Sequence, residues 1–227
     1  MKHIILAGDS VFDNRSYVKE GEPDVRDQLD DLLDDGDKVT LIAVDGDMNN
    51  DVTKQLDNIP KDATHLFISI GGNDALMHID SFTESVSTIG EALDSLNEKA
   101  EEFEKEYIKM LTNVSNKKLN TTLCTIYNPC FEHNDMARLT YMLPPNPNIN
   151  KLQKRSVTAL AIFNNIIFQE AFNFGLPVMD LRLIFSDKKD YANPIEPSVF
   201  GGMKMARIIK EIVETHDFSI DQTKVYT

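Results

Sequence analysis

The sequence predicts an α/β protein in which a parallel sheet of about five strands lies between two layers of helices. Five short runs are apolar on consecutive residues, as is typical of strands covered on both faces. They alternate with longer segments whose apolar residues recur every three or four positions, as in amphipathic helices. This alternation favours a parallel sheet, because a crossover between parallel strands needs a connection about as long as a helix.

Each element follows from its own pattern. The predicted strands are residues 4–7, 39–44, 65–70, 122–127 and 177–181. The predicted helices are residues 24–33, 152–172 and 203–213, together with one long helix whose stripe runs through Val86, Ile89, Leu93, Leu96, Ala100, Phe103, Tyr107 and Met110. We expect that stripe to pack on the sheet. The order predicts a doubly wound, three-layer α/β/α sandwich with flavodoxin-like strand order, and it places any site at the carboxyl ends of the strands.

The chain is predicted to form a single domain over residues 1–227. It has 227 residues, 41% of them hydrophobic, and no shift in composition marks a boundary. A core of useful size can form from this composition. The segment 215–227 is polar, and we expect it to be loosely held.

Composition also excludes several classes of partner. The chain has 23 Lys and Arg against 37 Asp and Glu, a net charge of −14, which disfavours nucleic acid and anionic membrane surfaces. No apolar run approaches the ~20 residues that span a bilayer. Cys124 and Cys130 lack the spacing of a disulfide framework or a zinc site, so a reducing, cytoplasmic location is expected. We expect no cofactor.

Glycine and polar residues follow four of the predicted strands. In chain order they are Gly8-Asp9-Ser10, Asp45-Gly46-Asp47, Gly71-Gly72-Asn73-Asp74 and Tyr127-Asn128. Ser10 is suited to attack a carbonyl carbon, since it lies at the exit of a strand that ends with a glycine, two residues after Gly8. The backbone N–H groups of Ser10 and Gly46 and the side-chain amide of Asn73 would then bind the negative oxygen of the tetrahedral intermediate.

These residues resemble the signature blocks of a known family. Gly8-Asp9-Ser10 with Phe12-Asp13-Asn14 looks like the first block of the SGNH hydrolases, also called GDSL esterases and lipases. Gly46 falls where that family has its oxyanion glycine, and Gly71-Gly72-Asn73-Asp74 resembles its G-x-N-D block. The resemblance spans nearly the whole chain. It implies that Ser10 is the nucleophile, that Gly46 and Asn73 are oxyanion donors, and that the substrate is a small acyl ester.

The fourth block of that family, D-x-x-H, is replaced in this chain. Asn193 stands where the Asp is expected and Glu196 where the His is expected, so both usual partners of the serine are absent. Glu196 is the provisional base, because burial can raise the pKa of a carboxylate toward neutrality. His78 and His133 are the alternative candidates for the base, although a histidine in such a loop is more often simply solvated.

The segment 128–150 is long and rich in Pro and Asn, and it leaves the fourth strand at the same edge of the sheet. Long loops in such domains are usually functional or disordered. Four of its apolar residues are expected either to line an acyl or alcohol subsite or to cover the edge of the sheet. They are Phe131, Leu139, Tyr141 and Met142.

Two other functions remain open. Asp9, Asp45 and Asp74 follow three strands, as carboxylates would in a Mg²⁺-dependent phosphohydrolase, but their spacing disfavours metal use. We favour Asp9 and Asp74 as residues that cap a helix or brace a turn. Loss of the D-x-x-H block favours a binding module that has lost turnover, whereas retention of Ser10 and the oxyanion donors favours an active enzyme.

Overall fold

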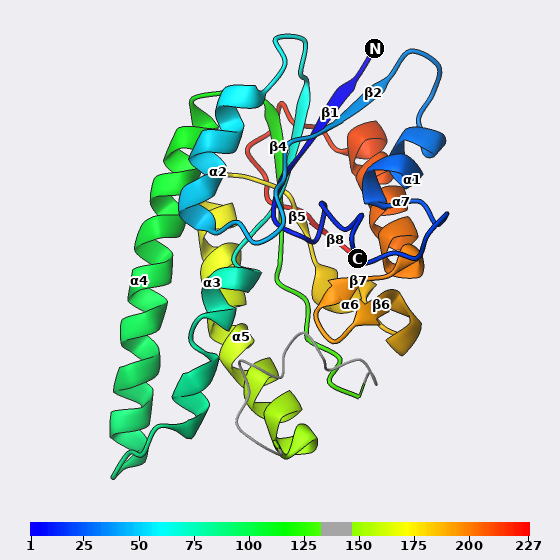
Figure 1. Cartoon of the computed structure of the whole chain (residues 1–227). Helices are drawn as coiled ribbons and strands as arrows, with labels where there is room; N and C mark the ends of the chain where they lie inside the picture. Colours follow the sequence, from blue (N-terminus) through cyan, green and yellow to red (C-terminus); the bar gives the residue numbers. More distant parts are fainter. Residues whose placement is uncertain (133–146) are drawn as a thin grey trace.

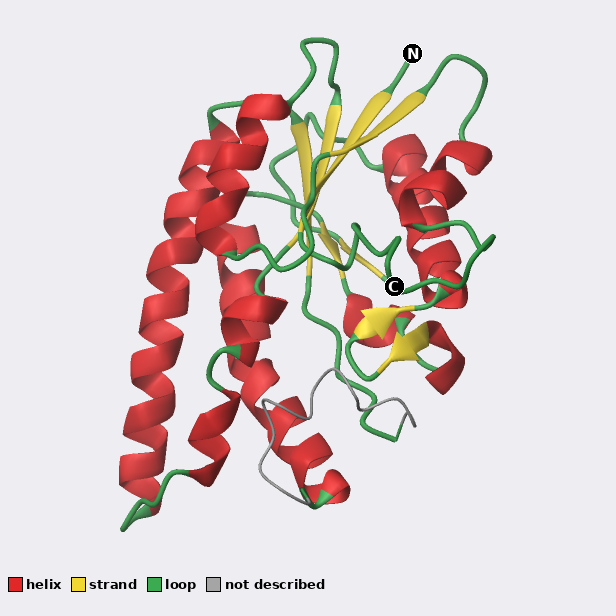
Figure 2. Ribbon diagram, viewed as in Figure 1, coloured by secondary structure: helices red, strands yellow, loops and turns green. Residues whose placement is uncertain are grey.

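Six parallel strands form one sheet in the computed structural model, which describes residues 1–132 and 147–227 (Figures 1 and 2). The strands are β1 (His3–Gly8), β2 (Lys38–Leu41), β3 (His65–Ser69), β4 (Asn120–Cys124), β5 (Val178–Met179) and β8 (Val225–Tyr226). Their order is β2-β1-β3-β4-β5-β8. The five predicted strands and their flavodoxin-like order are therefore confirmed, and the strands begin or end within a few residues of the predicted positions.

The sixth strand corrects one prediction. β8 lies in the segment 215–227, which we expected to be loosely held, and it pairs with β5. The backbone N–H of Val178 donates to Lys224 O at 2.8 Å, and that of Asp180 donates to Tyr226 O at 2.8 Å. Tyr226 is buried, 3% exposed. The edge of β5 carries backbone donors and acceptors that even a polar segment can pair with. Because this pairing uses backbone groups, no hydrophobic pattern in the sequence predicts it.

Helices cover both faces of the sheet (Figure 1). One face carries α1 (Val25–Leu32) and α7 (Val199–Thr215), and the other carries α2 (Asn49–Gln55), α4 (Ile89–Ser115) and α5 (Ile149–Asn173). In β1, Ile4 and Leu6 join the core with α1 and α7, whereas Ile5 and Ala7 join the core with α4 and α5. Successive side chains point to opposite faces of a strand, which explains why this strand is apolar at every position.

Short elements complete the chain at the carboxyl edge of the sheet. They are the helices α3 (Gly72–Leu76) and α6 (Leu181–Ile184), the 3-10 helices η2 (Ile79–Thr83) and η3 (Lys188–Asp190), and the antiparallel hairpin of β6 (Tyr191–Asn193) and β7 (Glu196–Pro197). The 3-10 helix η1 (Leu56–Asn58) lies at the opposite edge, between α2 and β3. Among the described residues, no helix is both long and apolar enough to cross a membrane.

The helices α4 and α5 extend past the carboxyl edge of the sheet (Figure 1). A helix of 27 residues is about 40 Å long, whereas a strand of five residues is about 17 Å long. The apolar stripe of α4 therefore divides: it is buried from Ala100 onward, but Ile89 and Leu93 are 81% and 59% exposed. The prediction that the whole stripe packs on the sheet is wrong at this end, and Val86 precedes the helix.

Candidate active site

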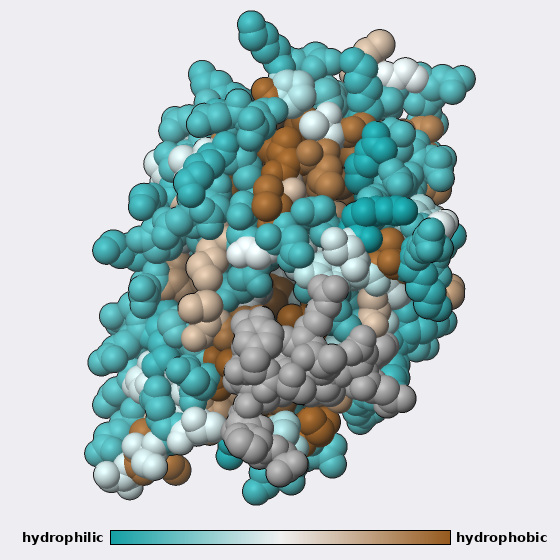
Figure 3. Space-filling model, in the orientation of Figure 1, coloured by the Kyte–Doolittle hydropathy of each residue, from teal (hydrophilic) through white to brown (hydrophobic). Residues whose placement is uncertain are grey.

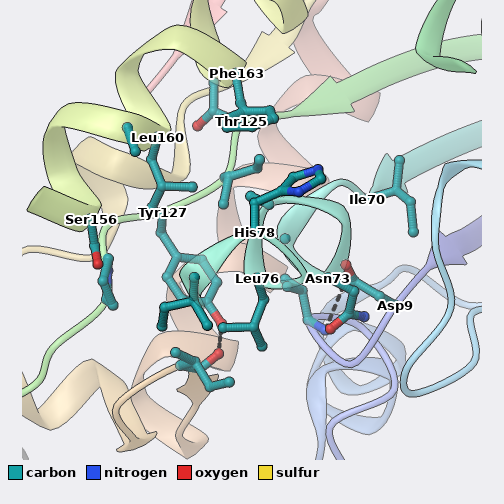
Figure 4. Close-up of a pocket in the computed structure, with 18 of the residues that line it drawn as sticks. Asp9, Ile70, Asn73, Leu76, His78, Thr125, Tyr127, Ser156, Leu160 and Phe163 are labelled. Carbon is teal, nitrogen blue, oxygen red and sulfur yellow. Dashed lines mark hydrogen bonds between the residues drawn. The ribbon is translucent and has the colours of Figure 1, made fainter. Parts of the chain in front are cut away.

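A cavity of about 120 Å³ opens at the carboxyl ends of β1, β3 and β4, between α3, α4 and α5 (Figure 4). A space-filling view shows a hollow with hydrophobic residues in an otherwise largely hydrophilic face (Figure 3). Of the catalytic candidates selected from the sequence, Asp9, Ser10, Asn73, His78 and Glu196 line the cavity. They come from three separate segments, which the fold brings to one place.

Three other sequence predictions fall elsewhere. Gly46 and Asn193 do not line the cavity. Gly46 lies in an exposed turn, and the Asn193 carboxamide oxygen accepts the N–H of Ile195 at 3.0 Å, which holds the turn between β6 and β7. His133 lies outside the described residues, as do Leu139, Tyr141 and Met142. Phe131 is described, and it does line the cavity.

Glycine at the end of β1 sets the position of Ser10. Gly8 has a φ of +126°, and a Cβ atom there would lie 1.8 Å from the backbone oxygen of Ser69 on β3. Only glycine fits so close an approach in this backbone conformation. The next residue, Asp9, donates its N–H to Ser69 O at 3.0 Å, so the ends of β1 and β3 are joined immediately before Ser10.

Side-chain amides tie the Gly46 turn to the same point. Gln55 of α2 accepts the N–H of Gly8 at 2.8 Å and donates to Gly8 O and to the Asp47 carboxylate, both at 2.7 Å. The Asn73 side-chain amide donates to Asp47 O at 2.9 Å. Asn73 is thus held one residue away from Gly46. Each bond is made to a backbone group or a buried amide, which fixes the relative positions of three strand ends.

Several donors at this point have no acceptor. Within residues 1–132 and 147–227, the backbone N–H groups of Ser10 and Gly46 make no hydrogen bond, and neither does the Ser10 hydroxyl. Asn73 uses one of its two amide hydrogens on Asp47. Ser10 is 7% exposed, so the hydroxyl and its own N–H belong to a largely enclosed site. Such donors can serve an anionic oxygen without first breaking a bond.

The hairpin that carries Glu196 is attached to the Ser10 segment by Asn14. The Asn14 side chain donates to Pro197 O at 3.3 Å and accepts the N–H of Val25 at 3.0 Å. On the cavity side, the Tyr127 hydroxyl donates to Ile195 O. Glu196 is 5% exposed, and it does not hydrogen-bond to the Ser10 hydroxyl in this structure. Its carboxylate nevertheless lines the same cavity as Ser10.

Burial dominates the electrostatics of the two aspartates near Ser10. It raises the pKa of Asp9 to about 7, partly offset by the hydrogen bond from the Val11 N–H and reinforced by the negative charge of Asp74. Burial likewise raises the pKa of Asp74 to about 6. The Asp9 carboxylate accepts the N–H of Val11 at 3.1 Å, and that of Asp74 accepts the N–H of Asn49 at 3.2 Å. Both aspartates brace a turn or a helix start, as predicted.

A metal ion or a histidine base would need particular side chains at this site. No three His, Cys, Asp or Glu residues among the described residues lie together in an arrangement that could hold a metal ion. His78 lines the cavity, and its ring has no hydrogen-bond partner in the described part of the chain. His3 and His65 lie at the opposite edge, where burial lowers the pKa of His65 to about 4.

Most of the cavity wall has no signal in the local sequence pattern. The cavity is lined by one face of α5, by residues of α4 and by residues that follow β4. They include Ser156, Leu160 and Phe163 of α5, Lys99 of α4, and Thr125. The apolar stripe of α4 was a usable signal, because its exposed half continues past the sheet. Which helix lies opposite that stripe depends on tertiary packing.

Solved structures of lipases and esterases share this fold. An extracellular lipase from Streptomyces rimosus is 14% identical with a TM-score of 0.60, covering 93% of this chain and 99% of its own. The acetyl xylan esterase AlAXEase is 18% identical with a TM-score of 0.59, again over 93% and 99%. A GDSL-like lipase from Bacteroides thetaiotaomicron is 12% identical with a TM-score of 0.57, over 94% and 88%.

No protein-family model and no curated protein sequence matches the chain. The likeness is thus one of structure, and the chain has the fold of the GDSL lipases and esterases, the SGNH hydrolase fold that its motifs predicted.

Proposed function

We propose that this protein is a serine esterase that cleaves a small acyl ester, with Ser10 as its nucleophile. One observation carries the proposal. Three strand ends are hydrogen-bonded to one another around Ser10, while the buried N–H group of Ser10 and one amide hydrogen of Asn73 have no acceptor among the described residues. Structure-forming donors are normally paired, so preorganised donors beside a serine are typical of an oxyanion hole.

The chemistry follows from these positions. Ser10 Oγ attacks the acyl carbon while its proton passes to a base, and the carbonyl oxygen becomes an oxyanion. The N–H group of Ser10 and the free amide hydrogen of Asn73, both on the cavity wall, bind that oxyanion. Collapse of the tetrahedral intermediate expels the alcohol, which takes the proton from the base. Water then hydrolyses the acyl-enzyme by the same two steps.

Glu196 is the base we propose. It is a buried carboxylate on the cavity wall, and it comes from the hairpin that replaces the D-x-x-H block. Asp9 is the other carboxylate among the described lining residues, but its hydrogen bond to the Val11 N–H assigns it to the turn. His78 on the cavity wall and His133 remain the alternative proton acceptors.

The test is hydrolysis of p-nitrophenyl acetate by the purified protein. We expect Ser10→Ala to lower kcat by at least ~10³-fold and Glu196→Gln by ~10²-fold, the usual scales for a nucleophile and a general base. His78→Gln is the matched change on the same wall, and it should have little effect if Glu196 is the base. An unchanged rate in Ser10→Ala would end the esterase proposal.

The same assay separates the alternatives. A wild-type protein that binds esters without turnover would be the binding module that loss of the Asp and His favours. Activity abolished by a chelator and retained in Ser10→Ala would instead support the metal-dependent phosphohydrolase.

A further inference from the structure

The cavity changes character along its length. Near Ser10 its wall is polar and acidic, with Asp9 and Glu196, and further on it is formed by apolar side chains such as Leu76, Leu160 and Phe163. Beyond these, polar groups return with Ser156 and Lys99. In Figure 4, Ser156 lies across the cavity from Asp9 and Asn73.

The helix register places these groups relative to the sheet. α4 and α5 each precede a strand of the same parallel sheet, so the two helices run in the same direction. Phe103 and Phe163 are in contact, with ring centroids 5.0 Å apart. Lys99 lies four residues before Phe103, about 6 Å further from the sheet, and Ser156 lies seven residues before Phe163, about 10 Å further. Both groups therefore belong to the end of the cavity that is remote from Ser10.

Lys99 is the only Lys or Arg among the described residues that line the cavity. Its ammonium group donates to Ser95 Oγ at 2.9 Å and makes a long contact with Ser95 O at 3.4 Å. No carboxylate of the described residues lies within 4 Å of it, although the chain carries a net charge of −14. An ammonium group with only neutral partners retains donors for an anion.

Ser156 supplies a second, independent observation. It is 8% exposed, and its hydroxyl group makes no hydrogen bond with any described residue. The carbonyl one turn earlier is usually within reach of a helical serine, but this hydroxyl makes no such bond and stays accessible. A ligand group that accepts a hydrogen bond would satisfy it.

We propose that the acyl chain of the substrate ends in a carboxylate, so that the substrate is a half-ester of a dicarboxylic acid and Lys99 determines specificity for it. This rests on the proposed function for the Ser10 end of the cavity. The apolar wall would cover the methylene groups, and Lys99 and Ser156 would bind the free carboxylate. The Glu196 carboxylate at the other end repels a carboxylate, so it favours the orientation that places the ester at Ser10.

The experiment compares monomethyl adipate with methyl hexanoate, a neutral ester of the same chain length. We expect the wild type to prefer the half-ester by about tenfold in kcat/KM, the scale of one charge-assisted hydrogen bond. Lys99→Met should bring that ratio close to one, chiefly through KM, and Lys99→Arg should retain most of it. Ser156→Ala should lower the ratio by a smaller factor. Lys105→Met removes the same charge from the exposed face of α4 and is the matched control.

Binding of monomethyl adipate and of methyl hexanoate to the Ser10→Ala variant, measured by calorimetry, separates the two proposals. A preference for the half-ester that disappears in Ser10→Ala/Lys99→Met supports this inference whether or not Ser10 is the nucleophile. Equal binding of both esters, or a preference that survives loss of Lys99, overturns it, and the esterase proposal then stands or falls on the kcat of Ser10→Ala alone.

Discussion

The two sides of the cavity are stabilised differently. On the Ser10 side, the ends of β1, β2 and β3 are joined by the close contact at Gly8 and by hydrogen bonds from the side-chain amides of Gln55 and Asn73. On the Glu196 side, a short hairpin depends on residues that are far away in the sequence. The hairpin is supported by Asn14, by Tyr127 and by the buried carboxylate of Asp190. The first arrangement is local to the sheet. The second assembles contacts across most of the chain, so the two sides should respond differently to substitution.

The largest effect is expected where the Ser10 side depends on contact between backbones. In Gly8→Ala the new methyl group would lie 1.8 Å from Ser69 O, so β1 and β3 must separate. We expect a loss of more than ~4 kcal/mol in the free energy of unfolding, or no folded protein, measured by urea denaturation. Gly21→Ala has a similar φ, +84°, but nothing within 4 Å, and should cost only ~1 kcal/mol. Equal losses would refute the contact argument.

The hairpin side should weaken most at Asp190. This carboxylate is fully buried and accepts the N–H groups of Ser186 and Asp187 at 3.0 and 2.9 Å and the ammonium of Lys204 at 2.6 Å. Asp190→Asn leaves that ammonium without its charge partner, and we expect a loss of about 3 kcal/mol in the free energy of unfolding. The exposed pair at Asp57 is the control, because Asp57→Asn should change stability by less than ~0.5 kcal/mol.

The buried carboxyl of Asp9 should make the stability of the Ser10 side depend on pH. Burial raises the pKa of Asp9 to about 7 in the folded protein, well above the ordinary range of an aspartate, so the folded state keeps a proton that the unfolded chain has lost. Its contribution to stability is therefore greatest below pH 4 and falls as the pH rises toward 7. The free energy of unfolding of Asp9→Asn, relative to that of the wild type, should therefore rise by on the order of 2 kcal/mol between pH 4 and pH 8, measured in urea denaturation series. A difference that does not change with pH would contradict the burial of this carboxyl.

The smallest effect is expected at Tyr127. Its ring stacks on Phe185 with centroids 4.6 Å apart, and its hydroxyl donates to Ile195 O beside Glu196. Tyr127→Phe keeps the stacking and removes only the hydrogen bond, so we expect ~1 kcal/mol of lost stability. If the bond positions Glu196, kcat for p-nitrophenyl acetate should fall about tenfold with KM little changed. A parallel loss in Asn14→Ala would show that the whole hairpin, rather than one bond, sets the rate.

Local patterns explain why the Ser10 side could be predicted. Ser10 and Asn73 each lie within a few residues of the end of an apolar run, and parallel strands end at one edge, so their positions in the sequence predicted that they lie together. Glu196 was selected because it occupies the position of a missing histidine, and its burial depends on Asn14 and Tyr127, which lie far away in the chain. No local pattern encodes such contacts.

The sequence predicted five of the six strands, their order and the glycine turns at the carboxyl edge. Strands and turns depend on residues that are neighbours in the chain, and the alternation of strands with helices favours this strand order. Only the tertiary structure decided that α5 faces α4 beyond the sheet, that β8 completes its edge, and that Lys99 and Ser156 share a cavity with Ser10. Those features arise from packing between segments tens of residues apart, where shape and the satisfaction of buried polar groups select one arrangement from many.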